Sequence, residues 1–165
     1  MKKYLLKFEK LFLLFREYNV DFAIHNDIAI YLWGVRKKIR YVDIIIDFNE
    51  ENIERFVRLM KNMGMKIKKN IRYKFLPELL KEREKYEDDY LIFYHRRILP
   101  WRIKLWLKDS LRNYSTVEKK IGEVKVPVVS LEDLVNFKRK KLSLKEIQDF
   151  HFMKNILSDI LEKVP

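Results

Sequence analysis

The sequence contains no cysteine, and it has only three glycines and four prolines among its 165 residues. The lack of cysteine excludes disulfides and thiolate-bound metal sites, and it fits a reducing compartment. No stretch reaches the roughly 20 apolar residues of a membrane-spanning helix, and Lys7, Glu9 and Lys10 come too early for a signal peptide. The sequence therefore predicts a cytoplasmic protein that does not enter a membrane.

The rest of the composition indicates a folded, strongly basic protein. Hydrophobic residues make up 48% of the chain and aromatic residues 14%, which excludes a disordered chain and favours a single domain over residues 1–165. The 36 Lys and Arg residues exceed the 24 Asp and Glu residues, giving a net charge of +12. This charge favours RNA, DNA or nucleotide phosphates as partners, although a solvated lysine-rich surface would give the same value. The bias towards Lys, Ile and Glu indicates a thermophilic source such as an archaeon.

The first half of the chain alternates between helical and strand patterns. Apolar positions at helical spacing predict a helix over 4–18, and a short strand follows at 20–24. Asn26 is expected to cap a helix that runs to Trp33, with Gly34 as its C-terminal cap.

The second half continues with short strands and ends in helices. β-branched residues predict a strand over 41–48, and Asn49 is expected to cap a helix that ends at Gly64. Pro127 would suit an edge strand, and Ser130 is expected to cap the first of two C-terminal helices. The remaining expected elements are strands at 65–69, 89–95, 101–107 and 124–129, a helix or loop at 76–88, and helices at 131–141 and 144–162.

One stretch carries a resemblance to a known family. Residues 20–47, VDFAIHNDIAIYLWGVRKKIRYVDIIID, combine a strand, a helix, a basic loop and a strand that ends in aspartate. This layout resembles the active-site half of the small nucleotidyltransferases of the DNA polymerase beta superfamily. The resemblance implies one α/β (α+β) domain with a mixed β-sheet and flanking helices, its core at about 18–129 and its C-terminal helices at about 130–162.

The C-terminal part supports the same resemblance. The segment KVPVVSLEDLVNFKRKKLSLKEIQDF is similar to a strand-and-helix segment of bacterial and archaeal nucleotidyltransferase-like proteins, including those of abortive-infection and toxin–antitoxin systems. The matching residues are Leu134, Lys138, Lys145, Glu146 and Asp149. Glu146 departs from the pattern, because aspartate is usual there.

In the family, a Gly-Gly or Gly-Ser pair opens the helix and approaches the triphosphate. Two aspartates at i and i+2 on the next strand share one face and hold two metal ions, which drive transfer of the nucleotidyl group. A third carboxylate usually comes from a later strand. The resemblance thus implies Mg²⁺ as cofactor if the protein is active, and none otherwise.

The catalytic residues depart from this pattern. The glycine pair falls on Asn26 and Asp27, and the negative charge of Asp27 would repel a phosphate. Asp43 matches either the second catalytic aspartate, with Tyr41 at the first, or the first, with Ile45 at the second.

Two further positions weaken the metal site. Asp47 shares a face with Asp43, but about 13 Å separates their Cα atoms at about 3.3 Å per residue, too far for one metal pair. Lys104 falls at the third carboxylate. Asp43 and Asp47 remain the catalytic candidates, with Asp43 the metal ligand if there is one.

Other candidate residues surround this cleft. The resemblance places His25, Asn26, Asp27 and Lys138 at the nucleotide, although His25 could equally be a histidine with a structural hydrogen bond. The basic residues of loop 36–40 are candidate nucleic-acid contacts, or ordinary solvated charges: Arg36, Lys37, Lys38 and Arg40. Trp101 and Trp106 are expected in the core.

Three hypotheses follow. The first is a catalytically degenerate nucleotidyltransferase fold, a pseudoenzyme that binds nucleotide or nucleic acid through a basic surface. The second is an active Mg²⁺-dependent nucleotidyltransferase with a rearranged site. The third is a toxin–antitoxin-type component whose fold serves a protein partner or a homodimer.

Overall fold

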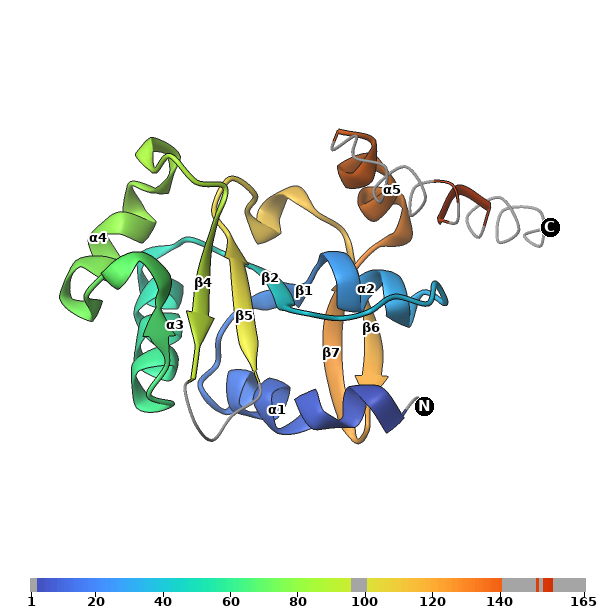
Figure 1. Cartoon of the computed structure of the whole chain (residues 1–165), viewed down its shortest axis with the longest axis horizontal. Helices are drawn as coiled ribbons and strands as arrows, with labels where there is room; N and C mark the ends of the chain where they lie inside the picture. The colour runs from blue at the N-terminus through green and yellow to red at the C-terminus, as the bar shows by residue number, and fades with distance from the viewer. Residues whose placement is uncertain (1–2, 96–100, 141–150, 152, 156–165) are drawn as a thin grey trace.

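The computed structural model describes residues 3–95, 101–140, 151 and 153–155. Its centre is a seven-stranded mixed sheet with the order β3-β4-β5-β2-β1-β7-β6 (Figure 1). The strands are β1 (Phe22–Ile24), β2 (Val42–Ile46), β3 (Lys66–Ile67), β4 (Tyr90–Tyr94), β5 (Arg102–Trp106), β6 (Thr116–Ile121) and β7 (Val124–Val129). β2 is parallel to β5 and antiparallel to β1, while β1 is parallel to β7, so the expected mixed α/β domain is confirmed.

Within the described residues, five α-helices with defined bounds join and flank the strands, and residues 151 and 153–155 are helical as well. The five are α1 (Glu9–Glu17), α2 (Asn26–Leu32), α3 (Glu50–Asn62), α4 (Leu76–Lys81) and α5 (Leu131–Arg139). Single 3₁₀ turns occupy Lys3–Phe8, Lys68–Asn70, Tyr73–Phe75, Arg83–Lys85 and Leu111–Asn113. Most of the helix expected at 144–162 lies outside the described residues. None of the described helices is long and apolar enough to cross a membrane.

The helix boundaries follow local chemistry. The Asn49 side chain accepts a hydrogen bond from the Asn52 amide at 2.9 Å and caps α3, as expected. Ser130 caps α5 in the same way, accepting from the Asp133 amide at 3.3 Å. Gly34 follows the end of α2 with φ +107°, a conformation that a residue with a Cβ adopts only with strain.

Asn26 does not cap α2. His25 holds the N-cap position, and Asn26 is the first helical residue with φ +48°. Its side chain points into the sheet and bonds to Asp43 instead of to the helix amides. A tertiary hydrogen bond to a buried carboxylate thus outweighs the local capping preference.

The expectation that Pro127 lies at a sheet edge is also wrong. Residues 116–121 form β6, which the sequence did not predict, and the β6–β7 hairpin makes β6 the outer strand. Pro127 is tolerated in the inner strand because only one residue pair, Ile24 with Val128, joins β7 to β1. The sequence did not predict β6 because TVEKKI is mostly polar and exposed, as an edge strand can be.

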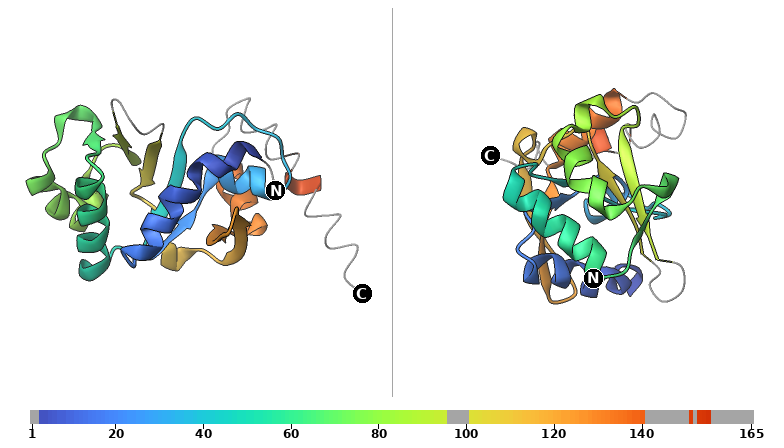
Figure 2. Two further views of the ribbon diagram at one scale, coloured as in Figure 1. Left: turned by 90° about the horizontal axis from the view of Figure 1, so that it is seen from below. Right: turned by 90° about the vertical axis from the view of Figure 1, so that its left-hand side faces the viewer.

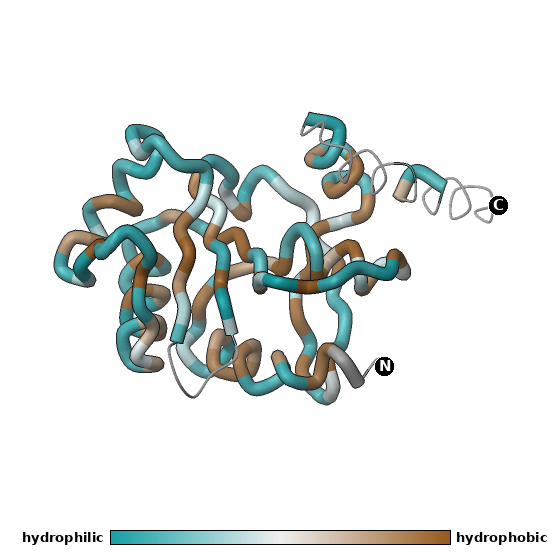
Figure 3. Tube along the Cα trace, viewed as in Figure 1, coloured by the Kyte–Doolittle hydropathy of each residue, from teal (hydrophilic) through white to brown (hydrophobic). Residues whose placement is uncertain are grey.

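The core lies between the sheet and the helices α1 and α3. Phe12 and Phe15 of α1 pack on Phe22 of β1, with ring centroids 6.0 and 4.7 Å away. Phe56 of α3 meets the edge of Phe93 of β4 at 5.4 Å. The rings of Phe15 and Phe56, 6.5 Å apart, join these two helices, which Figure 2 shows from two further sides. β4 is brown over much of its length, whereas α3 alternates between teal and brown (Figure 3).

Asn52 fastens α3 to the sheet. Its amide side chain is fully buried and donates to the carbonyl oxygens of Asp21 and Asp47 at 2.9 and 2.7 Å. Its Oδ1 accepts from the Asp21 amide at 2.7 Å. These bonds fix the ends of β1 and β2 and therefore the position of Asp47.

Candidate functional site

Asp43 lies in the middle of the sheet, on β2, and its residue is only 1% exposed. Its Oδ2 accepts hydrogen bonds from the Asn26 Nδ2 at 3.0 Å and from the Trp106 Nε1 at 2.9 Å. Its Oδ1 has no hydrogen-bond partner among the described residues. The His25 amide donates to the Asp43 carbonyl at 2.9 Å, which holds the start of α2 against β2.

Lys104 stands beside Asp43 on the neighbouring parallel strand, because β2 and β5 pair these two residues in register. The ammonium is surrounded by aromatic rings, with Nζ 4.5 Å from the ring centroids of Tyr41 and Tyr90. A third ring, Trp106, has its centroid at 5.6 Å. These cation–π contacts stabilise a lysine charge at the position where the resemblance expects an acid.

Burial raises the pKa of Asp43 from its ordinary 3.8 to about 6. The Lys104 charge opposes this rise, while the nearby Asp27 carboxylate adds to it. The hydrogen bonds from Asn26 and Trp106 also lower the pKa, but less than burial raises it. Asp43 is thus a carboxylate that is costly to ionise.

Asp27, at the start of α2, does not present an uncompensated charge. The Lys37 Nζ lies 2.6 Å from its Oδ1, and the two side chains are 3% and 13% exposed for Lys37 and Asp27. Lys37 is therefore not one of the exposed cations of loop 36–40. Arg36, Lys38 and Arg40 are exposed.

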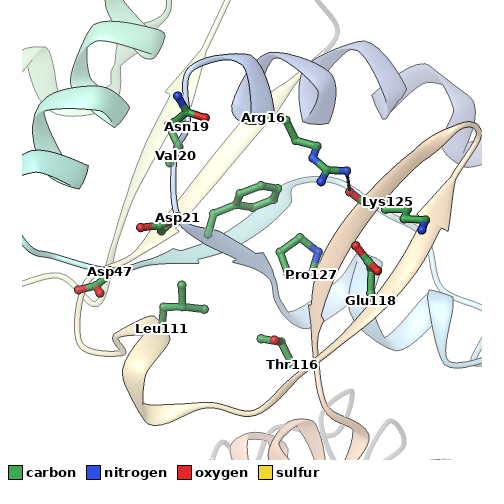
Figure 4. A pocket seen from close by; sticks show the side chains of 11 residues that line it. Arg16, Asn19, Val20, Asp21, Asp47, Leu111, Thr116, Glu118, Lys125 and Pro127 are labelled. Carbon is green, nitrogen blue, oxygen red and sulfur yellow. Dashed lines mark hydrogen bonds between the residues drawn. The ribbon is translucent and has the colours of Figure 1, made fainter.

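Asp47 lies beyond the other end of β2, away from Asp43. Its Oδ2 accepts from the Arg112 Nε at 3.2 Å, and its Oδ1 from the Asn49 amide at 3.3 Å. It lines a hollow of about 660 Å³ between the end of α1, β1 and the β6–β7 hairpin (Figure 4). Arg16 crosses this hollow to donate to the Lys125 carbonyl at 2.9 Å. The structure therefore does not bring Asp47 together with Asp43.

His25 and Lys138 both lie inside the protein, next to α5. His25 is fully buried, with ring centroids of Phe137, Tyr114 and Trp106 at 4.3, 5.3 and 6.0 Å. Lys138 is 1% exposed. Through these contacts the His25 ring packs where β1, β5 and α5 meet.

Trp106 lies in the core, as expected, but its role in this site was not predicted from the sequence. Its indole donates to the Asp43 carboxylate and its ring borders Lys104. The alternation of WRIKLWL contained the signal, since residues 104 and 106 of one strand share a face with Asp43 of the next.

The residues present do not fit a two-metal centre. No three His, Asp or Glu side chains in the described part of the chain are grouped as metal ligands. The Oδ2 of Asp43 already accepts two hydrogen bonds, which leaves Oδ1 as its open oxygen, and Lys104 places a positive charge beside the carboxylate. Asp27 is paired with Lys37, and Asp47 is held by Arg112.

The seven-stranded mixed sheet with its flanking helices is a nucleotidyltransferase-like fold. No protein-family model matches the chain, and no curated protein matches its sequence.

Solved structures do match. The lincosamide antibiotic adenylyltransferase LnuA with lincomycin bound has a TM-score of 0.62 at 14% identity, over 91% of this chain and 96% of that one. ANT(2")-Ia in complex with adenylyl-2"-tobramycin gives 0.61 and 14%, over 98% and 94%. An antigenic nucleotidyltransferase-like protein from Paracoccidioides brasiliensis gives 0.61 and 15%, over 100% and 91%. At these identities the similarity establishes the fold.

Proposed function

We propose that this protein is a catalytically degenerate nucleotidyltransferase that binds nucleotide or nucleic acid through a basic surface. The observation that carries the proposal is the pairing of Lys104 with Asp43 in register across β2 and β5. A lysine at this position opposes the binding of divalent cations, which two-metal transfer requires.

Two further observations support the loss of transfer. Ile45, two residues after Asp43 on the same strand, is fully buried and offers no ligand. The indole of Trp106 and the amide of Asn26 occupy the Oδ2 of Asp43. Mg²⁺ could reach only the remaining oxygen, Oδ1, and it would have to approach the Lys104 ammonium, which its charge makes unfavourable.

The binding part of the proposal rests on charge and on the fold. Arg36, Lys38 and Arg40 are exposed in the loop between α2 and β2, and the chain carries a net charge of +12. The similar structures contain lincomycin and an adenylylated tobramycin, so this fold holds a nucleotide-derived or antibiotic ligand in those proteins. We expect nucleoside triphosphate or nucleic acid to bind here without reaction.

Two measurements test the proposal. Incubation with radiolabelled ATP, Mg²⁺ or Mn²⁺ and RNA is expected to give no nucleotidyl transfer, because no metal pair can form. Isothermal titration at low salt is expected to detect binding of ATP or of a single-stranded oligonucleotide. The triple substitution of Arg36, Lys38 and Arg40 by Gln should weaken that binding, whereas the same change at Lys10, Lys120 and Lys125 should not.

Two outcomes would contradict the proposal. Transfer by the wild-type protein that disappears in the Asp43→Asn variant would establish an active enzyme with a rearranged site. Binding of neither ATP nor oligonucleotide at low salt would remove the binding function.

A further inference from the structure

A second basic surface lies on the chain that connects α3 to α4. Residues 55–77 contain eight Lys and Arg residues and no Asp or Glu. We call the exposed part of this segment the β3 surface: Lys61, Lys66, Lys68, Arg72, Lys74 and Phe75. It lies at the α3–α4 end of the molecule, whereas the loop that follows α2 lies at the opposite end (Figure 1). The two basic regions are therefore separate.

The cations of the β3 surface are not held in ion pairs with described residues, although Lys68 lines a hollow that Glu87, Asp88 and Asp89 also line. None of its five Lys and Arg side chains makes an ion pair with a residue in the described ranges. Other basic residues of the same segment are paired: Lys69 with Glu87 and Asp88, and Arg58 with Glu54. The β3 surface thus retains a concentration of positive charge that attracts a polyanion.

The backbone holds these cations in a fixed arrangement. Ile67 is buried, whereas Lys66 of the outer strand β3 and Lys68 of the following 3₁₀ helix are exposed. Lys69 and Asn70 follow with φ +69° and +56°, both in the left-handed region. Such conformations are costly for residues other than glycine and persist where their surroundings fix them. A fixed arrangement loses little entropy when a ligand binds.

An exposed aromatic ring adjoins the charges. Phe75 is 56% exposed, and the Lys74 Nζ lies 4.9 Å from its ring centroid. Exposed aromatic rings beside lysine and arginine are the means by which proteins bind unpaired bases and their phosphates. The bases of a duplex are already stacked on one another, so they cannot stack on the Phe75 ring.

We propose that the β3 surface binds single-stranded nucleic acid, with its cations on the phosphates and Phe75 stacked on a base. This inference rests on the nucleic-acid part of the proposed function, and it adds the β3 surface to loop 36–40 as a second contact for the strand. It requires no reaction and no metal ion.

The test measures fluorescence anisotropy of labelled 20-nucleotide oligouridylate and oligothymidylate at several salt concentrations. The test variant replaces Lys66, Lys68, Arg72 and Lys74 by Gln. The matched control removes the same charge elsewhere, by replacing Lys10, Lys120, Lys125 and Lys140 by Gln. Each phosphate contact contributes about 0.7 to the slope of log affinity against log salt, so the test variant should lose about 3 from its slope and the control almost none.

The Phe75→Ala variant separates stacking from charge. We expect it to bind about tenfold more weakly with an unchanged salt slope, because one stacked base is lost and no phosphate contact is. If the fourfold variant does not fold, the pairs Lys66→Gln with Lys68→Gln, and Arg72→Gln with Lys74→Gln, should each give half of the slope change.

Each remaining outcome decides between the proposals. An equal slope change in the test and control variants would overturn the assignment to the β3 surface. Loss of binding only when loop 36–40 is neutralised would overturn it as well. In both cases the proposed function would stand. Equal affinity for a duplex, with Phe75→Ala unchanged, would overturn the single-strand assignment. Binding of ATP but of no oligonucleotide would overturn this inference alone, and binding of neither would overturn both.

Discussion

Replacing Asp43 by Asn should change how the stability of the protein depends on pH. Asn keeps the shape of the side chain, and its carbonyl oxygen can accept the hydrogen bonds from Asn26 and Trp106 that Asp43 accepts. It cannot ionise, however. The difference in unfolding free energy between the wild type and the variant therefore isolates the cost of charging Asp43 inside the sheet.

The direction follows from the raised pKa. The folded protein holds the Asp43 proton up to about pH 6, whereas the unfolded chain releases it near 3.8. Between these values the folded state binds more protons, so the wild type loses stability relative to Asp43→Asn as the pH rises. The rise from 3.8 to about 6 corresponds to about 3 kcal/mol, most of which falls between pH 4 and pH 7.

Urea unfolding followed by tryptophan fluorescence at pH 4, 5, 6 and 7 measures this difference. Contributions from the other titrating groups cancel, because both proteins contain them. If the unfolding free energies of the two proteins depend on pH in the same way across this range, the pKa of Asp43 is not raised. If the wild type becomes more stable relative to the variant as the pH rises, the pKa is shifted in the opposite direction. Trp33, Trp101 and Trp106 are present as fluorescence probes in both proteins.

Three further predictions concern the residues around the site. Trp106→Phe should raise the pKa of Asp43 above its wild-type value, because the indole hydrogen bond lowers it; the pH dependence of urea unfolding measures the change. Lys37→Met should lower the unfolding free energy at pH 7 by about 3 kcal/mol, because it leaves the Asp27 carboxylate enclosed without its partner; an unchanged urea midpoint would show that solvent compensates the charge. Asn52→Ala should cost about 3 kcal/mol, since three hydrogen bonds to the ends of β1 and β2 are lost, and thermal unfolding would detect it.

The sequence was sufficient for those parts of the fold that local chemistry determines. The Asn49 and Ser130 caps and the strand around residues 41–48 follow from neighbouring residue types and were predicted correctly. β6 was missed because an exposed hairpin strand has no apolar alternation to reveal it. Its existence depends on pairing with β7, which is a tertiary contact.

The site depended on tertiary contacts to a greater degree. Spacing along the chain could suggest Lys104 as the replacement for an acid, but only the register of β2 and β5 places it beside Asp43. The role of Asn26 could not be predicted, because its partner lies 17 residues away on another element. The ion pair of Asp27 with Lys37 was missed for the same reason, although both residues had been singled out.

The two edges of the sheet bear on how this protein behaves at high concentration. Unpaired strand edges are templates for strands of other chains, and proteins blunt them by short length and by lysine. β3 pairs over only two residues and carries Lys66, while β6 carries Glu118, Lys119 and Lys120. Neither edge therefore offers a long apolar strand for edge-to-edge growth, so the sheet resists aggregation through strand addition despite its many β-branched residues.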